Sequence, residues 1–230
     1  MAEFGSWTQF AYKESIWNLY AIYMERKEKG NLYGIYMHEL RRDNDWQERI
    51  ILAGFGGQGI VLMGKLLAYA GLLEGRNVTC LPSYGPEMRG GTANCMVILS
   101  RDRIGSPYVT NPSSLIVMNH PSFERFEPTV ERGGCVLVNR TLVKSEVGRN
   151  DVTVASVHAT LEAEELGDVR VANMIALGAF TRVRPIVKVD SLIQALKKTL
   201  PAGRKEMLLL DERAIWRGCE SVQVGVAIAE

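Results

Sequence analysis

The sequence predicts an α/β fold: a Rossmann-like three-layer domain with a mostly parallel sheet, preceded by an aromatic-rich helical extension. Three observations predict it. From residue 49 onward, short apolar segments alternate with helical segments, and several are apolar at every position, as in strands covered on both faces. A glycine-rich turn follows the first apolar segment directly. Ten of the 18 aromatic residues fall within residues 1–46. We therefore expect an extension over residues 1–46 and an α/β domain over residues 47–230.

The extension is expected to be mainly helical. Trp17, Tyr20, Ala21 and Met24 recur at three- and four-residue steps, which is typical of an amphipathic helix, here expected from Trp7 to Lys29. Two interpretations stay open. Either the helix packs back onto its own domain, or it is a docking arm that buries its rings on a partner chain.

The domain is expected to contain six strands and five helices. Apolar runs predict strands over residues 49–54, 77–82, 92–100, 114–119, 135–140 and 151–159. Apolar periodicity predicts helices over residues 58–73, 159–166, 173–182, 191–200 and 205–220. The apolar tail, residues 224–229, is a candidate for a last edge strand.

Composition excludes several classes of protein. The 27 Lys and Arg residues against 26 Asp and Glu residues give a net charge of +1, so net charge makes no case for binding nucleic acid or an anionic membrane. The uncharged run from Ile50 to Gly64 is 15 residues long, whereas a membrane span needs roughly 18. No secretory signal pattern is visible at the N-terminus. We expect a cytoplasmic protein with no membrane partner.

The four cysteines predict no metal centre. They form no CxxC motif and none has a histidine at ligand spacing, so an iron–sulfur or structural zinc site built by this chain alone is not expected. Cys80, Cys95 and Cys135 lie in apolar runs and are expected to be reduced thiols of the core.

The glycine-rich turn is the candidate cofactor site. Gly54, Gly56, Gly57, Gln58 and Gly59 lie where a strand ends and a helix begins. Such a turn lets backbone N–H groups approach the phosphates of a cofactor, and the helix N-terminus adds partial positive charge. The spacing matches GxGxxG, but the segment NVTCLPSY lacks the acidic residue that an NAD site places after its second strand. No GK[ST] sequence follows the glycines, so the turn is not a P-loop.

A second loop, between two apolar segments, is the candidate active-site or interface loop. It is rich in glycine, holds one acid and one base, and follows the carboxyl end of a strand, where open α/β sheets place ligands. Alternatively, its acid and base simply pair on the surface. The residues singled out are Tyr84, Gly85, Pro86, Glu87, Arg89, Gly90, Gly91, Thr92 and Asn94.

The segments GFGGQG, SYGPEMRGGTAN, IGSPYVTNPSSLIVMN and VANMIALGAF, in this order, resemble the gamma subunits of 2-oxoacid:ferredoxin oxidoreductases. The resemblance covers about residues 48–220 and is greatest to the gamma chains of 2-oxoglutarate and 2-oxoisovalerate enzymes. Gamma chains of this family usually start just before the first strand, so residues 1–46 depart from the pattern.

The resemblance implies a hetero-oligomeric enzyme that converts a 2-oxoacid, expected to be 2-oxoglutarate, and CoA into acyl-CoA and CO2 while reducing ferredoxin. It implies alpha and beta subunits, and in some assemblies a delta subunit, as partners. Thiamine diphosphate, Mg and iron–sulfur clusters are expected on those partners. The CoA site is expected to be shared between this chain and the partners. Arg89 is expected to supply a positive charge to the carboxylate of the 2-oxoacid or to a phosphate of CoA. We assign no catalytic residue, His120 and His158 included. The alternatives are a stand-alone Rossmann-type nucleotide-binding enzyme and a pure scaffold subunit.

Overall fold

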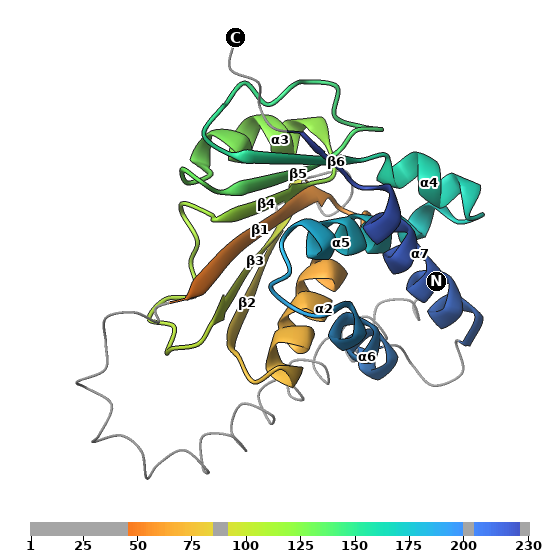
Figure 1. Cartoon of the computed structure of the whole chain (residues 1–230), viewed down its shortest axis with the longest axis horizontal. Coiled ribbons are helices and arrows are strands. Elements are labelled where there is room, and N and C mark those ends of the chain that lie inside the picture. Colours follow the sequence, from red (N-terminus) through yellow and green to blue (C-terminus); the bar gives the residue numbers. More distant parts are fainter. Residues whose placement is uncertain (1–45, 85–91, 200–204, 226–230) are drawn as a thin grey trace, which may run out of the picture. The chain divides into compact units, whose positions relative to one another are not determined.

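The chain is built around a seven-stranded sheet, seen here in a computed structural model that describes residues 46–84, 92–199 and 205–225 (Figure 1). The predicted extension up to residue 45, with its helix from Trp7 to Lys29, lies outside the described residues. The strands are β1 (Gln47–Phe55), β2 (Asn77–Tyr84), β3 (Thr92–Ser100), β4 (Ser114–Val117), β5 (Cys135–Asn139), β6 (Thr153–Val157) and β7 (Gln223–Gly225).

The sheet is mixed but mostly parallel, as the sequence predicts. Its strand order is β2-β3-β1-β4-β5-β6-β7. Strands β1, β4, β5 and β6 pair in parallel, whereas β3 is antiparallel to both β1 and β2, and β7 is antiparallel to β6. The carboxyl ends of β1, β2, β4, β5 and β6 therefore lie at the same edge of the sheet.

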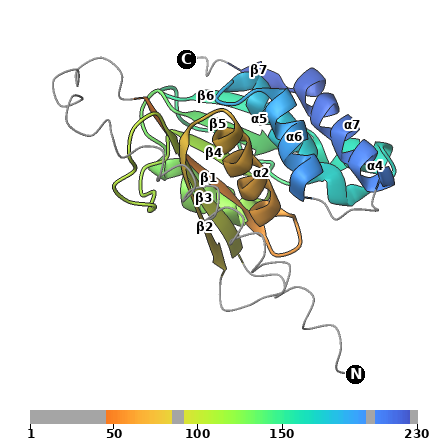
Figure 2. The same ribbon diagram turned by 90° about the horizontal axis from the view of Figure 1, so that it is seen from below.

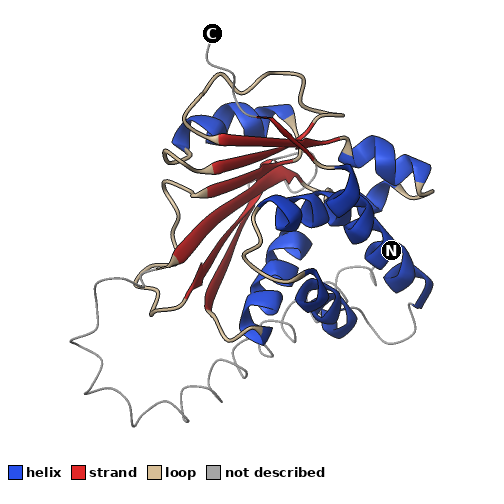
Figure 3. Ribbon diagram, viewed as in Figure 1, coloured by secondary structure: helices blue, strands red, loops and turns tan. Residues whose placement is uncertain are grey.

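Helices cover both faces of the sheet, which makes three layers (Figure 3). One face carries α2 (Ile60–Leu73), α4 (Ala159–Glu165), α5 (Ala172–Val183), α6 (Val189–Thr199) and α7 (Lys205–Ser221). The other carries α3 (His120–Phe126). Two short 3-10 turns, η1 (Glu127–Thr129) and η2 (Val169–Val171), precede loops or helices.

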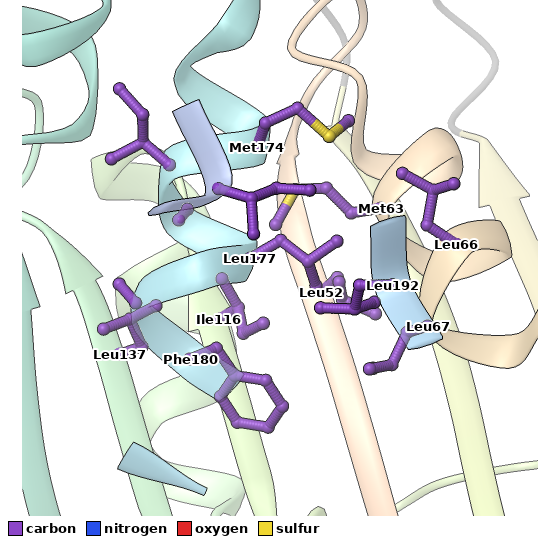
Figure 4. Close-up of a cluster of buried hydrophobic side chains, with 14 of the residues drawn as sticks. Leu52, Met63, Leu66, Leu67, Ile116, Leu137, Met174, Leu177, Phe180 and Leu192 are labelled. Carbon is purple, nitrogen blue, oxygen red and sulfur yellow. The ribbon is translucent and has the colours of Figure 1, made fainter. Parts of the chain in front are cut away.

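Successive side chains of β1 explain why the strand is apolar at nearly every position. Ile50 and Leu52 belong to the core beneath α2 and α5, while Ile51 and Ala53 belong to the core beneath α3. Figure 4 shows the larger core, in which side chains of β1, α2 and α5 meet. All four of these β1 side chains are at most 1% exposed, and burying each large one contributes about 1.5–3 kcal/mol.

Helices α5 and α7, which lie on the same face of the sheet (Figure 2), pack against each other because two glycines let their backbones approach. A β-carbon on Gly178 would lie 1.9 Å from the carbonyl oxygen of Ile215, and one on Gly218 would lie 1.9 Å from that of Ile175. A side chain at either position would force the helices apart.

The predicted strands and helices are confirmed with small shifts at their ends. The first helix starts at Ile60 rather than residue 58, and the edge strand is Gln223–Gly225, with residues 226–229 outside the described part. The sequence analysis missed α3, a helix of seven residues. Among the described residues, no helix is both long and apolar enough to cross a membrane.

Candidate functional site

The glycine-rich turn lies at the carboxyl end of β1 and leads into α2. Gly57 has φ of 103° and Gly59 has φ of 71°, backbone conformations that favour glycine. Gly59 is the N-cap residue of α2, and no side chain makes a capping hydrogen bond there. The first N–H groups of a helix have no acceptor within the helix, so this end of α2 suits an anion.

The side chain of Gln58 fills the inner side of the turn. Its Oε1 accepts a hydrogen bond from the backbone N–H of Phe55 at 2.9 Å, and its Nε2 donates to the carbonyl oxygen of Met118 at 3.1 Å. A β-carbon on Gly54 would lie 2.4 Å from Gln58 Oε1. In this arrangement the Gln58 amide joins the ends of β1 and β4 and shapes the turn from within.

The outer side of the turn is open at Gly57. In the described part of the chain, a β-carbon there would meet no atom within 4 Å. A ligand can therefore reach the turn on the side of Gly57 but not on the side of Gly54, where Gln58 stands.

Asn173, which the sequence analysis did not single out, supports the turn from α5. A β-carbon on Gly59 would lie 2.1 Å from Asn173 Nδ2. The Asn173 side chain is buried, and its Oδ1 accepts a hydrogen bond from the N–H of Met174 at 2.9 Å. The only sequence signal for it is its place in the segment VANMIALGAF.

The start of β3 lies beside the turn. Thr92 pairs with Phe55, and Asn94 pairs with Ala53. Asn94 is 7% exposed, and its Oδ1 is buried with no hydrogen-bond partner among the described residues. Tyr84 ends β2 opposite Ala93. The remaining residues of the predicted loop, Gly85, Pro86, Glu87, Arg89, Gly90 and Gly91, lie outside the described residues.

A cleft of about 330 Å³ adjoins the turn. It is lined by the end of β1, the start of β3, the start of α3 and the loop after β5: Phe55, Thr92, Asn119, His120, Pro121 and Leu142. Asn119 caps α3 by accepting a hydrogen bond from the N–H of Ser122 at 3.0 Å. His120 lies 3.4 Å from the carboxylate of Glu124 and is half-exposed. Its contacts among the described residues are with Glu124 and the ring of Phe123, neither of them a nucleophile for it to activate, so we assign it no catalytic role.

A larger hollow of about 930 Å³ lies between α5, α7 and β7 and contains none of the predicted site residues. Within the described part of the chain, no group of three or more His, Cys, Asp and Glu side chains is placed to hold a metal ion. Cys95 and Cys135 are buried, as predicted, whereas Cys80 is half-buried. Burial raises the pKa of Cys135 to about 11.

A family model described as pyruvate ferredoxin/flavodoxin oxidoreductase matches residues 49–220. The chain is 37% identical over 173 residues to the ketoisovalerate oxidoreductase subunit VorA of Methanothermobacter thermautotrophicus, covering 75% of this chain and 36% of that one. It thus spans about a third of VorA. It is 35% identical over 167 residues to the 2-oxoglutarate synthase subunit KorC of Methanocaldococcus jannaschii, covering 71% of this chain and 89% of KorC.

Among solved structures, the gamma subunit of the keto/oxoacid ferredoxin oxidoreductase of Geobacter sulfurreducens has the same fold. It superposes with a TM-score of 0.68 at 25% identity, covering 76% of this chain and 96% of that one. The predicted α/β fold is confirmed by this likeness.

Proposed function

The chain belongs to the pyruvate ferredoxin/flavodoxin oxidoreductase family, and from this we propose that it is the gamma subunit of a multi-subunit 2-oxoacid:ferredoxin oxidoreductase. The complete enzyme converts a 2-oxoacid and CoA into acyl-CoA and CO2 and reduces ferredoxin. The observation that carries the proposal is the family match over residues 49–220, which runs from within β1 to within α7.

We propose 2-oxoglutarate as the substrate of the assembly. The support is length: KorC matches over 89% of its own chain, whereas VorA, at a similar identity, matches over only 36% of its chain. The competing substrates are 2-oxoisovalerate and pyruvate, and the assay described below distinguishes the three.

The part of this chain is to help bind CoA and close the active site. CoA carries a diphosphate, and the open side of the turn at Gly57, next to an uncapped helix N-terminus, suits a phosphate group. The backbones of Gly56, Gly57 and Gly59 are proposed to face that group, while Gln58 holds the turn in shape. When bound, CoA supplies the thiol that accepts the acyl group.

The electron-transfer chemistry is proposed to lie on partner subunits. Thiamine diphosphate, Mg and iron–sulfur clusters are assigned to the alpha and beta subunits, with a delta subunit where one is present, because this sequence has no CxxC motif. Ferredoxin is the proposed acceptor of the assembly.

The assembly is tested by purifying the native complex through a tag on this chain. We expect partner subunits to co-purify and the complex to reduce ferredoxin or a viologen dye only when both a 2-oxoacid and CoA are present. Comparing 2-oxoglutarate, 2-oxoisovalerate and pyruvate identifies the substrate. A chain that purifies alone and binds NAD would instead support a stand-alone nucleotide-binding enzyme.

The CoA site is tested by filling the open side of the turn. In the intact complex, Gly57→Leu is expected to raise the KM for CoA about tenfold, a loss of about 1.4 kcal/mol. Gly133→Leu is the matched control, because Gly133 also has positive φ (75°) and open space but precedes β5 at the opposite edge of the sheet. An equal KM for CoA in both variants would refute the site.

A pure scaffold remains the second candidate, and the Gln58 amide that fills part of the turn favours it. Arg89→Ala separates the two. If the loop faces the active site, this change lowers turnover while the complex stays intact. If the loop is only a subunit contact, the change releases the subunit.

A further inference from the structure

Two thiols from different strands face each other on the sheet surface beneath α2. Cys80 of β2 and Cys95 of β3 have their sulfur atoms 3.5 Å apart. Cys80 pairs with Val97 and Cys95 pairs with Pro82, so the two cysteines are diagonal neighbours on one face of the hairpin. The function proposed above gives neither thiol a role.

The two thiols differ in access to solvent. Cys95 is fully buried, and a β-carbon on Gly64 of α2 would lie 2.3 Å from its sulfur. Cys80 is only half-buried and lies on β2, which is the edge strand of the sheet. A small oxidant can therefore reach the sulfur of Cys80 more easily than the buried sulfur of Cys95.

The electrostatics of the pair match this order. The hydrogen bond between the two thiols lowers the pKa of Cys80 against the opposing effect of burial, and the positive charge of Lys65 lowers it further. The same hydrogen bond, together with burial, raises the pKa of Cys95. The more exposed sulfur is thus the one of the pair that loses its proton more easily, and the thiolate is the reactive form of cysteine.

The other two cysteines lack this arrangement. Burial raises the pKa of both Cys135 and Cys219. The Cys219 thiol donates to the carbonyl oxygen of Gly178 at 3.2 Å. Cys219 is half-buried, as Cys80 is, so it is a natural control for simple exposure.

We propose that Cys80 and Cys95 form a reversible disulfide, a redox modification site that links β2 to β3 when the protein meets a peroxide. The Cys80 thiolate attacks hydrogen peroxide, breaks its O–O bond and becomes a sulfenic acid, and the released oxygen leaves as water. The Cys95 sulfur then attacks the Cys80 sulfur. The S–S bond forms, the S–O bond breaks, and the oxygen leaves as a second water with the Cys95 proton. Two thiols are oxidised and one peroxide is reduced.

The geometry needs one local movement. A disulfide brings its sulfur atoms to about 2.05 Å, so the pair must close by roughly 1.5 Å. Because diagonal neighbours lie farther apart than directly opposed residues, this needs a rotation of the Cys80 side chain together with a small shift of the edge strand β2. The link would lie in the stem of the hairpin that carries the predicted active-site loop, close to Tyr84 and Thr92. An external dithiol would reverse it.

The test uses the full chain with four thiols, oxidised with hydrogen peroxide, denatured and titrated. We expect two thiols to disappear, the mass to fall by two hydrogens, and dithiothreitol to restore both. Trypsin cuts after Arg76, Arg89 and Arg101, so the product should join the peptides 77–89 and 90–101. Cys219→Ser should behave in the same way.

Two variants isolate the steps. Cys80→Ser should form no disulfide, and Cys95→Ser should accumulate a sulfenic acid at Cys80 that dimedone captures. Because the wild-type mass and peptide map need no variant, the proposal stays falsifiable if Cys95→Ser does not fold. Four intact thiols after oxidation, or a disulfide between other cysteines or between two chains, would overturn it. None of these readouts depends on CoA or on partner subunits.

Discussion

Gly59 and Asn173 lie in direct contact, although they are far apart in the sequence. Gly59 is the N-cap residue of α2, and Asn173 is the second residue of α5. A β-carbon on Gly59 would lie 2.1 Å from Asn173 Nδ2. The contact links the glycine-rich turn to α5, which lies on the same face of the sheet as α2. It also means that Gly59 is required twice, for its φ of 71° and for its lack of a side chain.

Gly59→Ala is expected to destabilise the fold by about 3 kcal/mol, because backbone strain of about 1–2 kcal/mol adds to the clash with Asn173. Gly57→Ala is the control: it has positive φ but open space, so only the strain is expected. Urea denaturation measures both. If Asn173→Ala recovers about 1 kcal/mol in the Gly59→Ala background, the contact is confirmed, and equal losses in the two single variants would contradict it.

The sequence was sufficient for most of the fold. The strands were predictable because burial on both faces leaves few polar positions, as in the SLIV and CVLVN segments of β4 and β5, where every residue is buried. Helix α3 was missed because HPSFERF has a proline at its start and only Phe123 and Phe126 repeat at helical spacing, whereas the equally short α4 is rich in alanine and glutamate. The predicted start of α2 lies two residues before the observed one, because the contacts that hold Gln58 in the turn, with Phe55 and Met118, cannot be recognised in a sequence.

The candidate site was only partly predictable. The glycines were recognisable, since a turn between strand and helix requires them. The role of the Gln58 side chain was not, because it depends on the carbonyl oxygen of Met118, which directly follows β4, a strand that is distant in sequence from β1 but adjacent to it in the sheet. Asn173 was not singled out for the same reason: its contact with Gly59 exists only once α5 packs on the sheet.

The close approach of α5 and α7 predicts a large effect at Gly178. Gly178→Ala is expected to cost about 3 kcal/mol, because the added methyl group meets the backbone carbonyl of Ile215, which cannot move without shifting α7. Gly71→Ala in α2 is the control. There the nearest atom is the end of the Leu99 side chain at 2.4 Å, and alanine favours the helix by about 1 kcal/mol.

Thermal or urea unfolding of the two helix variants distinguishes these cases. The Gly71→Ala protein is expected to stay within about 1 kcal/mol of the parent. A Gly178→Ala protein as stable as Gly71→Ala would show that the helices are not held at backbone contact.

The buried ion pair between Glu48 and Arg184 predicts a second sensitive position. Glu48 is 2% exposed, and its carboxylate accepts from Arg184 Nη2 at 3.0 Å and from Ser114 Oγ at 2.5 Å. Arg184→Ala should cost about 3 kcal/mol because it leaves a buried carboxylate without its cation. Glu48→Gln in the same background should recover part of that loss, since the buried group is then neutral.

An exposed pair provides the comparison. Lys197 and Glu212 join α6 to α7 at 3.0 Å, with the lysine side chain 53% exposed, and Lys197→Ala is expected to cost less than about 1 kcal/mol. Denaturant unfolding of both variants at the same pH is the measurement. Similar losses at the two positions would mean that burial of Glu48 does not matter.

Asp211 of α7 predicts a pH dependence of stability. Burial, and secondly the neighbouring carboxylate of Asp168, raise the pKa of Asp211 to about 6 against the attraction of Arg170. The ordinary value is 3.8, so between about pH 4 and pH 6 the folded state holds a proton that the unfolded chain has lost. The free energy of unfolding must therefore fall as the pH rises through this range.

Asp211→Asn removes this dependence, because the amide stays neutral. The variant is expected to equal the parent below pH 4 and to exceed it above pH 6 by on the order of 2–3 kcal/mol. Urea denaturation between pH 4 and pH 8 measures the difference. Asp151→Asn should show the opposite sign: Arg149 lowers the pKa of Asp151 to about 2, so that carboxylate stabilises the fold above pH 4 and stops doing so as the pH falls toward 2. If the free energy of unfolding of Asp211→Asn follows that of the parent at every pH, Asp211 is ionised in the folded protein at little cost in stability.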